Sequence, residues 1–118
     1  MMPDADNTLS KAERISSKRD ISRLLSNGRW GNCEAVKYCI YIPNGLEFCR
    51  ILVSVPKKHF KRAVKRNLLK RRIREAYRTQ KALCQGKAAD ILLQYDSSEI
   101  LPFDQIKAIV ANVLKAIK

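Results

Sequence analysis

The chain has 118 residues, 46% of them hydrophobic, and its 24 Lys and Arg against 11 Asp and Glu give a formal net charge of +13. The length fits one domain, and the hydrophobic content suffices for a packed core, which excludes a wholly disordered basic arm. So positive a charge favours a polyanionic partner, either a nucleic acid or a membrane surface.

The first 13 residues, MMPDADNTLSKAE, are polar and of mixed charge, so we expect a mobile tail followed by one domain over residues 14–118. This start lacks the apolar run of a secretory signal. No stretch of the chain approaches the roughly 20 apolar residues of a membrane span. We therefore expect a cytoplasmic protein without a membrane partner.

A short helix is expected next, with Ser17 as its N-cap, Asp20 in its first turn and Gly28 at its end. Its apolar stripe consists of Ile21, Leu24 and Leu25.

Two segments of alternating character, 36–42 and 48–55, then predict strands. In the first, Tyr38 shares a face with Val36 and Ile40; in the second, Arg50 and Ser54 lie opposite the apolar residues. Between them, Pro43-Asn44-Gly45 is a turn signal, so we expect the two strands to form an antiparallel hairpin.

Between Lys57 and Lys81, twelve of 25 residues are Lys or Arg, opposed by Glu75 alone. Apolar residues at helical spacing predict a helix that begins just after residues 56–60 and ends near 85–86. On a helical wheel, one arc holds Arg66, Asn67, Lys70, Arg71, Arg74 and Arg78. The opposite side holds Leu69, Ile73, Ala76, Gln80 and Leu83, with Tyr77 at the border.

The run DILLQY, residues 90–95, suits a buried strand, and Pro102 suits the first turn of a last helix. Apolar residues at steps of three and four follow in that helix: Phe103, Ile106, Val110, Val113 and Ile117. The expected order is α-β-β-α-β-α, an α/β sandwich in which helices pack on a small sheet.

The basic arc points to RNA, because a guanidinium grips phosphate oxygens with two hydrogen bonds and stacks on bases. Asn67 could meet a phosphate, a 2′-hydroxyl or a metal-bound water. A solvated face without a ligand is the alternative, but like charges four residues apart repel and favour a counter-charge. A membrane-lying or calmodulin-binding helix is a third reading, against which the apolar side lacks Trp and Phe.

The stretch AVKRNLLKRRIREAYR, residues 63–78, resembles the signature helix of bacterial ribonuclease P proteins, approximately AVxRNRxKRxxREAFR. The similarity covers about residues 14–117. Outside the helix it includes Arg19-Asp20, Gly28-Arg29, Ser54-Val55, Lys57-Lys58 and the run DILL at 90–93.

The resemblance implies a subunit of an endoribonuclease that binds the catalytic ribonuclease P RNA and the 5′ leader of precursor tRNA. It would assist removal of that leader. In this family the RNA carries the chemistry with magnesium ions, so we expect no cofactor and no catalytic residue in the protein, with magnesium bound mainly by the RNA. The resemblance also implies a left-handed βαβ crossover. The protein alone is expected to be monomeric.

Carried onto matching positions, the resemblance assigns contacts with the catalytic RNA to Arg66, Asn67, Lys70, Arg71, Arg74 and Arg78, and to Lys57, Lys58 and Lys61 before the helix. The leader would lie in a cleft between the sheet and the first helix. There Tyr38 would stack on bases, although an ordinary strand aromatic is the alternative. Arg50, Ser54 and Arg19 would line the same cleft.

Four positions depart from the family pattern. A basic residue is usual where this chain has Leu68 or Asp96, and phenylalanine where it has Ile21 or Leu25. These differences bear on substrate contacts more than on RNA binding.

The residues argue against catalysis by the protein itself. His59 is the single imidazole, in a basic loop that disfavours its protonation. The acids are scattered, and no nucleophile motif or phosphate loop appears. The four cysteines form no CxxC pair, so buried or half-buried thiols are expected rather than a zinc site. The remaining alternative is a structural RNA-binding protein, for instance of ribosomal type, without a processing role.

Overall fold

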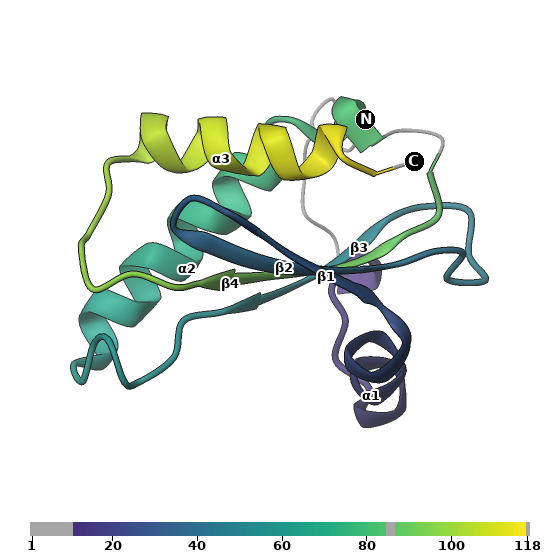
Figure 1. Ribbon diagram of the computed structural model, residues 1–118, viewed down its shortest axis with the longest axis horizontal. Coiled ribbons are helices and arrows are strands. Elements are labelled where there is room, and N and C mark those ends of the chain that lie inside the picture. Colours follow the sequence, from purple (N-terminus) through teal and green to yellow (C-terminus); the bar gives the residue numbers. More distant parts are fainter. Residues whose placement is uncertain (1–10, 85–86, 118) are drawn as a thin grey trace.

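The computed structural model describes residues 11–84 and 87–117 and shows a sheet with helices packed on both faces (Figure 1). The sheet has four strands in the order β1-β2-β4-β3. This α+β sandwich agrees with the fold expected from the sequence. In chain order its elements are η2 (Lys11–Glu13), α1 (Lys18–Asn27), β1 (Arg29–Cys33), β2 (Val36–Tyr41), β3 (Arg50–Ser54), α2 (Ala63–Arg78), η3 (Lys81–Cys84), β4 (Asp90–Tyr95) and α3 (Phe103–Lys115).

The described residues begin at Lys11, within the segment expected to be a mobile tail. Residues 1–10 of the predicted tail lie outside the described residues, but Lys11–Glu13 form a 3-10 helix. Glu13 accepts hydrogen bonds of 3.0 Å from Lys81 Nζ through both carboxylate oxygens. The chain then joins the sheet at Ile15, whose backbone N–H donates to Ile51 O at 2.9 Å.

Helix α1 begins and ends as its capping residues predict. The hydroxyl of Ser17 accepts a hydrogen bond from the Asp20 backbone N–H at 3.4 Å, and Gly28 N–H donates to Leu24 O at 2.8 Å. Leu24 is fully buried against the sheet. Of the other two residues in the apolar stripe, Ile21 is half-buried and Leu25 is 39% exposed.

The predicted hairpin between 36–42 and 48–55 is wrong. Strand β4 lies between β2 and β3, antiparallel to β2 and parallel to β3. The segment after β2 instead runs past the start of β4, where Asn44 is buried and its N–H donates to Ala88 O at 2.8 Å. A turn signal reports a local change of direction, whereas strand order depends on contacts with a segment about 40 residues away.

The hairpin of this fold joins β2 to β1, a strand that the sequence pattern did not reveal. The two are antiparallel from Arg29↔Ile40 to Cys33↔Val36, with Glu34 in the turn at φ 52°. A Cβ on Gly31 would lie 2.5 Å from the Tyr38 ring, so the glycine lets this ring cover the strand. The true order is therefore α-β-β-β-α-β-α.

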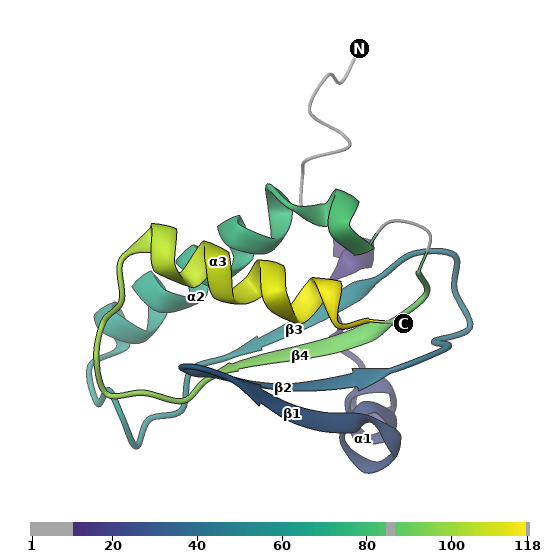
Figure 2. The same cartoon turned by 45° about the horizontal axis from the view of Figure 1, so that its top comes forward.

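The two faces of the sheet are covered unequally, as Figures 1 and 2 show. Helices α2 and α3 cover one face and enclose the main core, which includes Val36, Ile40, Ile51, Ile91 and Leu93. The other face carries α1 alone, above a small cluster of Ile15, Leu24, Cys39 and Leu92. The remainder of this second face is thus open to a ligand.

Helix α2 connects β3 to its parallel neighbour β4, and the left hand expected for this crossover stays a prediction. The helix ends at Arg78, earlier than the expected 85–86, and those two residues lie outside the described ones. Leu69, Ile73 and Ala76 are buried as predicted, and Tyr77, which was expected at the border, is buried with them. Leu83, which was expected to join them, lies in η3 and is 39% exposed.

The remaining expectations for the core agree with the structure. In α3 the residues Ile106, Ile109, Val110, Val113 and Leu114 are buried. All four cysteines are free thiols, three buried and Cys33 half-buried. Within residues 11–84 and 87–117, no helix combines the length and apolarity that crossing a bilayer requires.

Candidate nucleic-acid interface

The outward side of α2 presents a polar and cationic stripe. Asn67, Arg71 and Arg74 are exposed, while Leu69 and Ile73 on the opposite side are fully buried. Because the buried side fixes the rotation of the helix about its axis, these exposed side chains are held facing solvent. The predicted arc is therefore correct for these three residues, and Lys70 is half-buried beside them.

Arg66 belongs to the same arc but is turned onto the backbone. Its Nη1 donates to Phe60 O and to Lys61 O, both at 2.8 Å. These bonds fasten the segment 56–62 to the first turns of α2. Lys57, Lys58 and Lys61 are exposed on that segment, which extends the cationic surface beyond the helix.

Two further arginines of α2 are engaged in contacts within the fold. Arg78 pairs with Glu75, and this partner lowers the pKa of the Glu75 carboxyl. Arg72, on the flank of the stripe, donates from Nη1 to Leu101 O at 2.6 Å and ties α2 to the segment before α3. Arg62 and Lys65 are exposed, and sequence reasoning did not select them although they lie in the same basic run.

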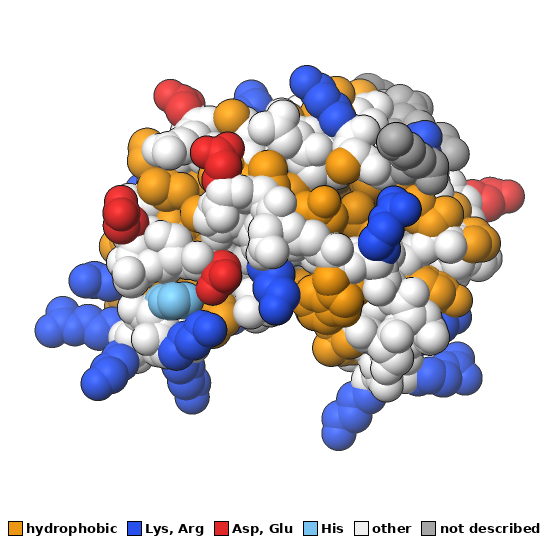
Figure 3. All heavy atoms as spheres, viewed as in Figure 1, with side chains coloured by type: hydrophobic (Ala, Val, Ile, Leu, Met, Phe, Trp, Pro, Cys, Tyr) orange, Lys and Arg blue, Asp and Glu red, His pale blue; other side chains and the backbone are white. Residues whose placement is uncertain are grey.

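A second surface lies beneath the sheet. Figure 3 shows the lower outline of the molecule hollowed between two groups of Lys and Arg side chains, one over the segment before α2 and the other over α1. We call this hollow the groove. Its floor is the sheet face that carries α1, since strand alternation places these half-buried or exposed side chains there: Trp30, Asn32, Lys37, Leu52, Ser54 and Gln94.

Trp30 is the exposed aromatic of this floor. The residue is 44% exposed, and its indole Nε1 donates to Leu25 O at the end of α1 at 3.3 Å. The Lys37 ammonium lies 5.1 Å from the centre of the Trp30 ring. A second such contact joins α1 to β2: the guanidinium of Arg23 on α1 lies 5.2 Å from the centre of the Tyr41 ring on β2. The sequence analysis missed Trp30 because it did not recognise β1.

The expected place of Tyr38 in this cleft is wrong. Its position on β2 alternates with Lys37 and Cys39, so it shares the opposite face with Val36 and Ile40 and packs against the main core. Its ring covers Gly31. The alternation of the strand already joined Tyr38 to Val36 and Ile40, and the error was to take that face as the open one.

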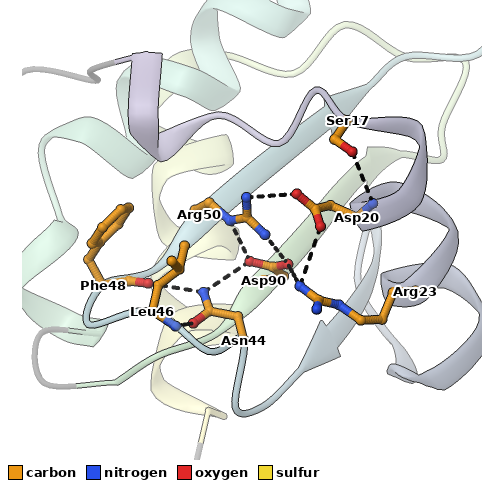
Figure 4. A network of polar contacts seen from close by, with 8 residues as sticks. All are labelled: Ser17, Asp20, Arg23, Asn44, Leu46, Phe48, Arg50 and Asp90. Carbon is orange, nitrogen blue, oxygen red and sulfur yellow. Dashed lines mark hydrogen bonds and ion pairs between the residues drawn. The ribbon is translucent and has the colours of Figure 1, made fainter.

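Arg50 and Ser54 do lie on the groove side, but Arg50 is not a free cation. Its guanidinium makes a bidentate pair with Asp90 and a further bond to Asp20 on α1, and its side chain is 12% exposed (Figure 4). The bond to Asp90 raises the pKa of Arg50, so it stays charged. Arg19 is exposed on the first turn of α1.

His59 and Asp96 meet at the rim before α2. His59 Nε2 lies 3.3 Å from Asp96 Oδ1, so the acid that replaces a usual basic residue lies within ion-pair distance of the single imidazole. Across the described parts of the chain, no three His, Cys, Asp or Glu side chains gather in a way that could hold a metal ion.

The chain is similar to known proteins over nearly its whole length. The ribonuclease P family model matches residues 9–118. The chain is 39% identical over 77 residues to the ribonuclease P protein component of Porphyromonas gingivalis, which covers 64% of this chain and little more than half, 56%, of that protein. Over 101 residues it is 33% identical to the Borrelia hermsii protein component, covering 85% and 87% of the two chains.

The fold agrees as well. The structure of the Staphylococcus aureus RNase P protein matches with a TM-score of 0.78 and 28% identity, covering 92% of this chain and 97% of that one. Since the family model spans nearly the whole sequence and the fold extends over the same length, this chain belongs to the ribonuclease P protein family.

Proposed function

We propose that this chain is the protein subunit of ribonuclease P. It binds the catalytic RNA and the 5′ leader of precursor tRNA, and it assists the endonucleolytic removal of that leader. The observation that carries the proposal is the exposed stripe of Asn67, Arg71 and Arg74 on a helix whose other side is fully buried, in a chain of this family.

The catalytic RNA binds along α2 and the segment before it. Arg71 and Arg74 grip phosphate oxygens, since a guanidinium offers paired donors in a fixed plane. Lys57, Lys58 and Lys61 neutralise further phosphates as point charges. Arg66 contributes charge and holds the segment in place through its two carbonyl contacts. Because the fold holds these groups ready, little side-chain order is lost on binding.

The leader lies in the groove as a single strand. Trp30, in place of Tyr38, offers the ring on which a base stacks, and Lys37 beside it faces the phosphate backbone. Arg19 and Ser54 flank the path. The leader must be single-stranded in the groove, because only an unpaired base exposes both of its flat faces to an aromatic side chain.

The chemistry belongs to the RNA, with magnesium ions held mainly by RNA phosphates. The protein contributes positive charge next to a dense polyanion, which lets the RNA and the substrate approach each other at lower magnesium concentrations. Asn67, exposed within the stripe, can reach a phosphate, a 2′-hydroxyl or a metal-bound water.

Reconstitution tests this proposal. The purified protein is added to a bacterial ribonuclease P RNA and a precursor tRNA at low magnesium, and cleavage at the mature 5′ end is measured. We expect cleavage to increase, and to increase more than with an equal charge of polylysine. No gain, together with good binding to unrelated RNAs, would favour a structural RNA-binding protein of ribosomal type instead.

A further inference from the structure

We propose that an ion cluster around Asp90 positions α1 and thereby sets how well the groove accepts a leader. The inference rests on the proposed function. It assigns Asp20, Arg50 and Asp90 a positioning role, in which none of the three needs to touch RNA. Their side chains join the first turn of α1 to two neighbouring strands (Figure 4).

The sheet side of this ion cluster is rigid. Asp90, the first residue of β4, is fully buried. Arg50 on the adjacent β3 donates from Nε to Asp90 Oδ1 at 2.9 Å and from Nη2 to Oδ2 at 2.7 Å. Asn44 Nδ2 donates the third hydrogen bond to this carboxylate, to Oδ1 at 3.0 Å. A carboxylate with these partners is held in one orientation.

The helix side completes the bridge. The remaining guanidinium nitrogen of Arg50, Nη1, donates to Asp20 Oδ2 on α1 at 3.1 Å. Arg23, one turn further along α1, places Nη2 3.5 Å from Asp20 Oδ1 and 3.8 Å from Asp90 Oδ2. Two carboxylates and two guanidiniums therefore alternate across the junction, and their formal charges balance.

Helix α1 has little else to fix its direction. Within α1, all of which the structure describes, Leu24 is the only buried side chain. The half-buried Ile21 packs against the same small cluster, so the apolar contact is confined to one turn near the middle of the helix, and the two ends of the helix can pivot about it. At its C-terminal end, hydrogen bonds from Cys39 Sγ to Leu24 O and from Trp30 Nε1 to Leu25 O, both at 3.3 Å, supply a second point of attachment. The Asp20–Arg50 pair supplies the corresponding point at the N-terminal end.

One substitution can distinguish a positioning role of Asp20 from a purely electrostatic role. If Asp20 only repelled the negative backbone of the leader, Asp20→Asn would strengthen leader binding. If Asp20 positions α1, the same change loosens one wall of the groove and weakens leader binding. The two accounts predict opposite signs for one substitution.

The experiment compares the affinity of the assembled holoenzyme for precursor tRNA with its affinity for the same tRNA lacking the leader. For Asp20→Asn we expect the preference for the precursor to fall roughly threefold or more. Arg50→Lys, which keeps the charge but cannot span both carboxylates, should give a similar loss. Because both residues act through one bridge, the double variant should lose less than the product of the two.

Asp104→Asn is the matched control. Asp104 lies in the first turn of α3, as Asp20 does in α1, so both variants lose one carboxylate at a helix N-terminus. We expect Asp104→Asn to keep the preference. An unchanged or increased preference in Asp20→Asn, or equal losses in both variants, would overturn the inference. If the unaltered protein shows no leader preference, the proposed function itself fails, and this result is distinct from a preference that survives in the variants.

Discussion

Arg66 and Arg71 show how two arginines of one helix can take different parts. Arg66 donates to Phe60 O and Lys61 O and so shapes the segment before the helix. Arg71 is exposed and keeps its donors for a partner. Both carry the same charge in the sequence, and only the fold separates a cation that is bonded within the structure from one that is exposed to solvent.

Arg71→Ala tests the exposed stripe. Loss of one phosphate contact should weaken binding to the catalytic RNA and lower the slope of log K against log salt concentration by about one unit. The measurement is a salt titration of RNA affinity. Lys115→Ala removes one charge from the exposed last turn of α3 and should leave the slope nearly unchanged. Equal slopes for Arg71→Ala and the unaltered protein would mean that the RNA binds elsewhere.

Trp30 offers a direct readout of the groove, because it is the only tryptophan of the chain. A base stacked on its exposed ring should quench its fluorescence, so precursor tRNA should quench more strongly than tRNA without a leader. The measurement is a fluorescence titration of the protein with each RNA. Similar quenching by both RNAs would remove Trp30 from the leader path.

At the scale of elements, the approach of α1 to β2 depends on Gly28. A Cβ at this position would lie 2.4 Å from Cys39 Sγ and 2.5 Å from Leu24 O. We expect Gly28→Ala to push the helix end from the sheet and to lower the free energy of unfolding by about 1–3 kcal/mol.

Urea denaturation measures this loss for Gly28→Ala. Ser26→Ala, at an exposed position two residues earlier, is the control and should change stability little. If the two variants are equally stable, the close approach at Gly28 does not constrain α1.

Elements with strong local signals were predictable from the sequence. The caps of α1, the buried side of α2 and the spacing of α3 all follow from interactions between residues three or four apart. Strand β1 gave no such signal, because RWGNC combines a glycine with polar residues and is never fully buried. The pairing of β4 between β2 and β3 was also beyond the sequence, since it joins segments far apart in the chain.

The candidate site divides in the same way. The outward stripe of α2 was predictable because the helical period alone places Arg71 on the side of the helix opposite the buried Ile73. The groove was not, because its floor depends on which sheet face the helices leave open. That choice moved Tyr38 into the core side and brought Trp30 to the surface.

At the scale of the whole molecule, basic and acidic side chains are distributed unevenly over the surface. Figure 3 shows Lys and Arg gathered along the lower outline, with most Asp and Glu above it. Self-repulsion among like charges on one side destabilises the isolated chain, and a polyanion bound there relieves it. Many of the basic side chains seen in this view therefore flank the groove in which the proposed leader would lie.

The central position of β4 has a consequence for synthesis of the chain. Both β2 and β3 pair with β4, yet β4 follows α2 in the sequence. A nascent chain that ends before residue 90 can form the β1–β2 hairpin but cannot assemble the sheet. The basic helix therefore leaves the ribosome before the complete sheet is available to cover its apolar side. Only the last quarter of the polypeptide buries that side and orients the cationic stripe toward solvent.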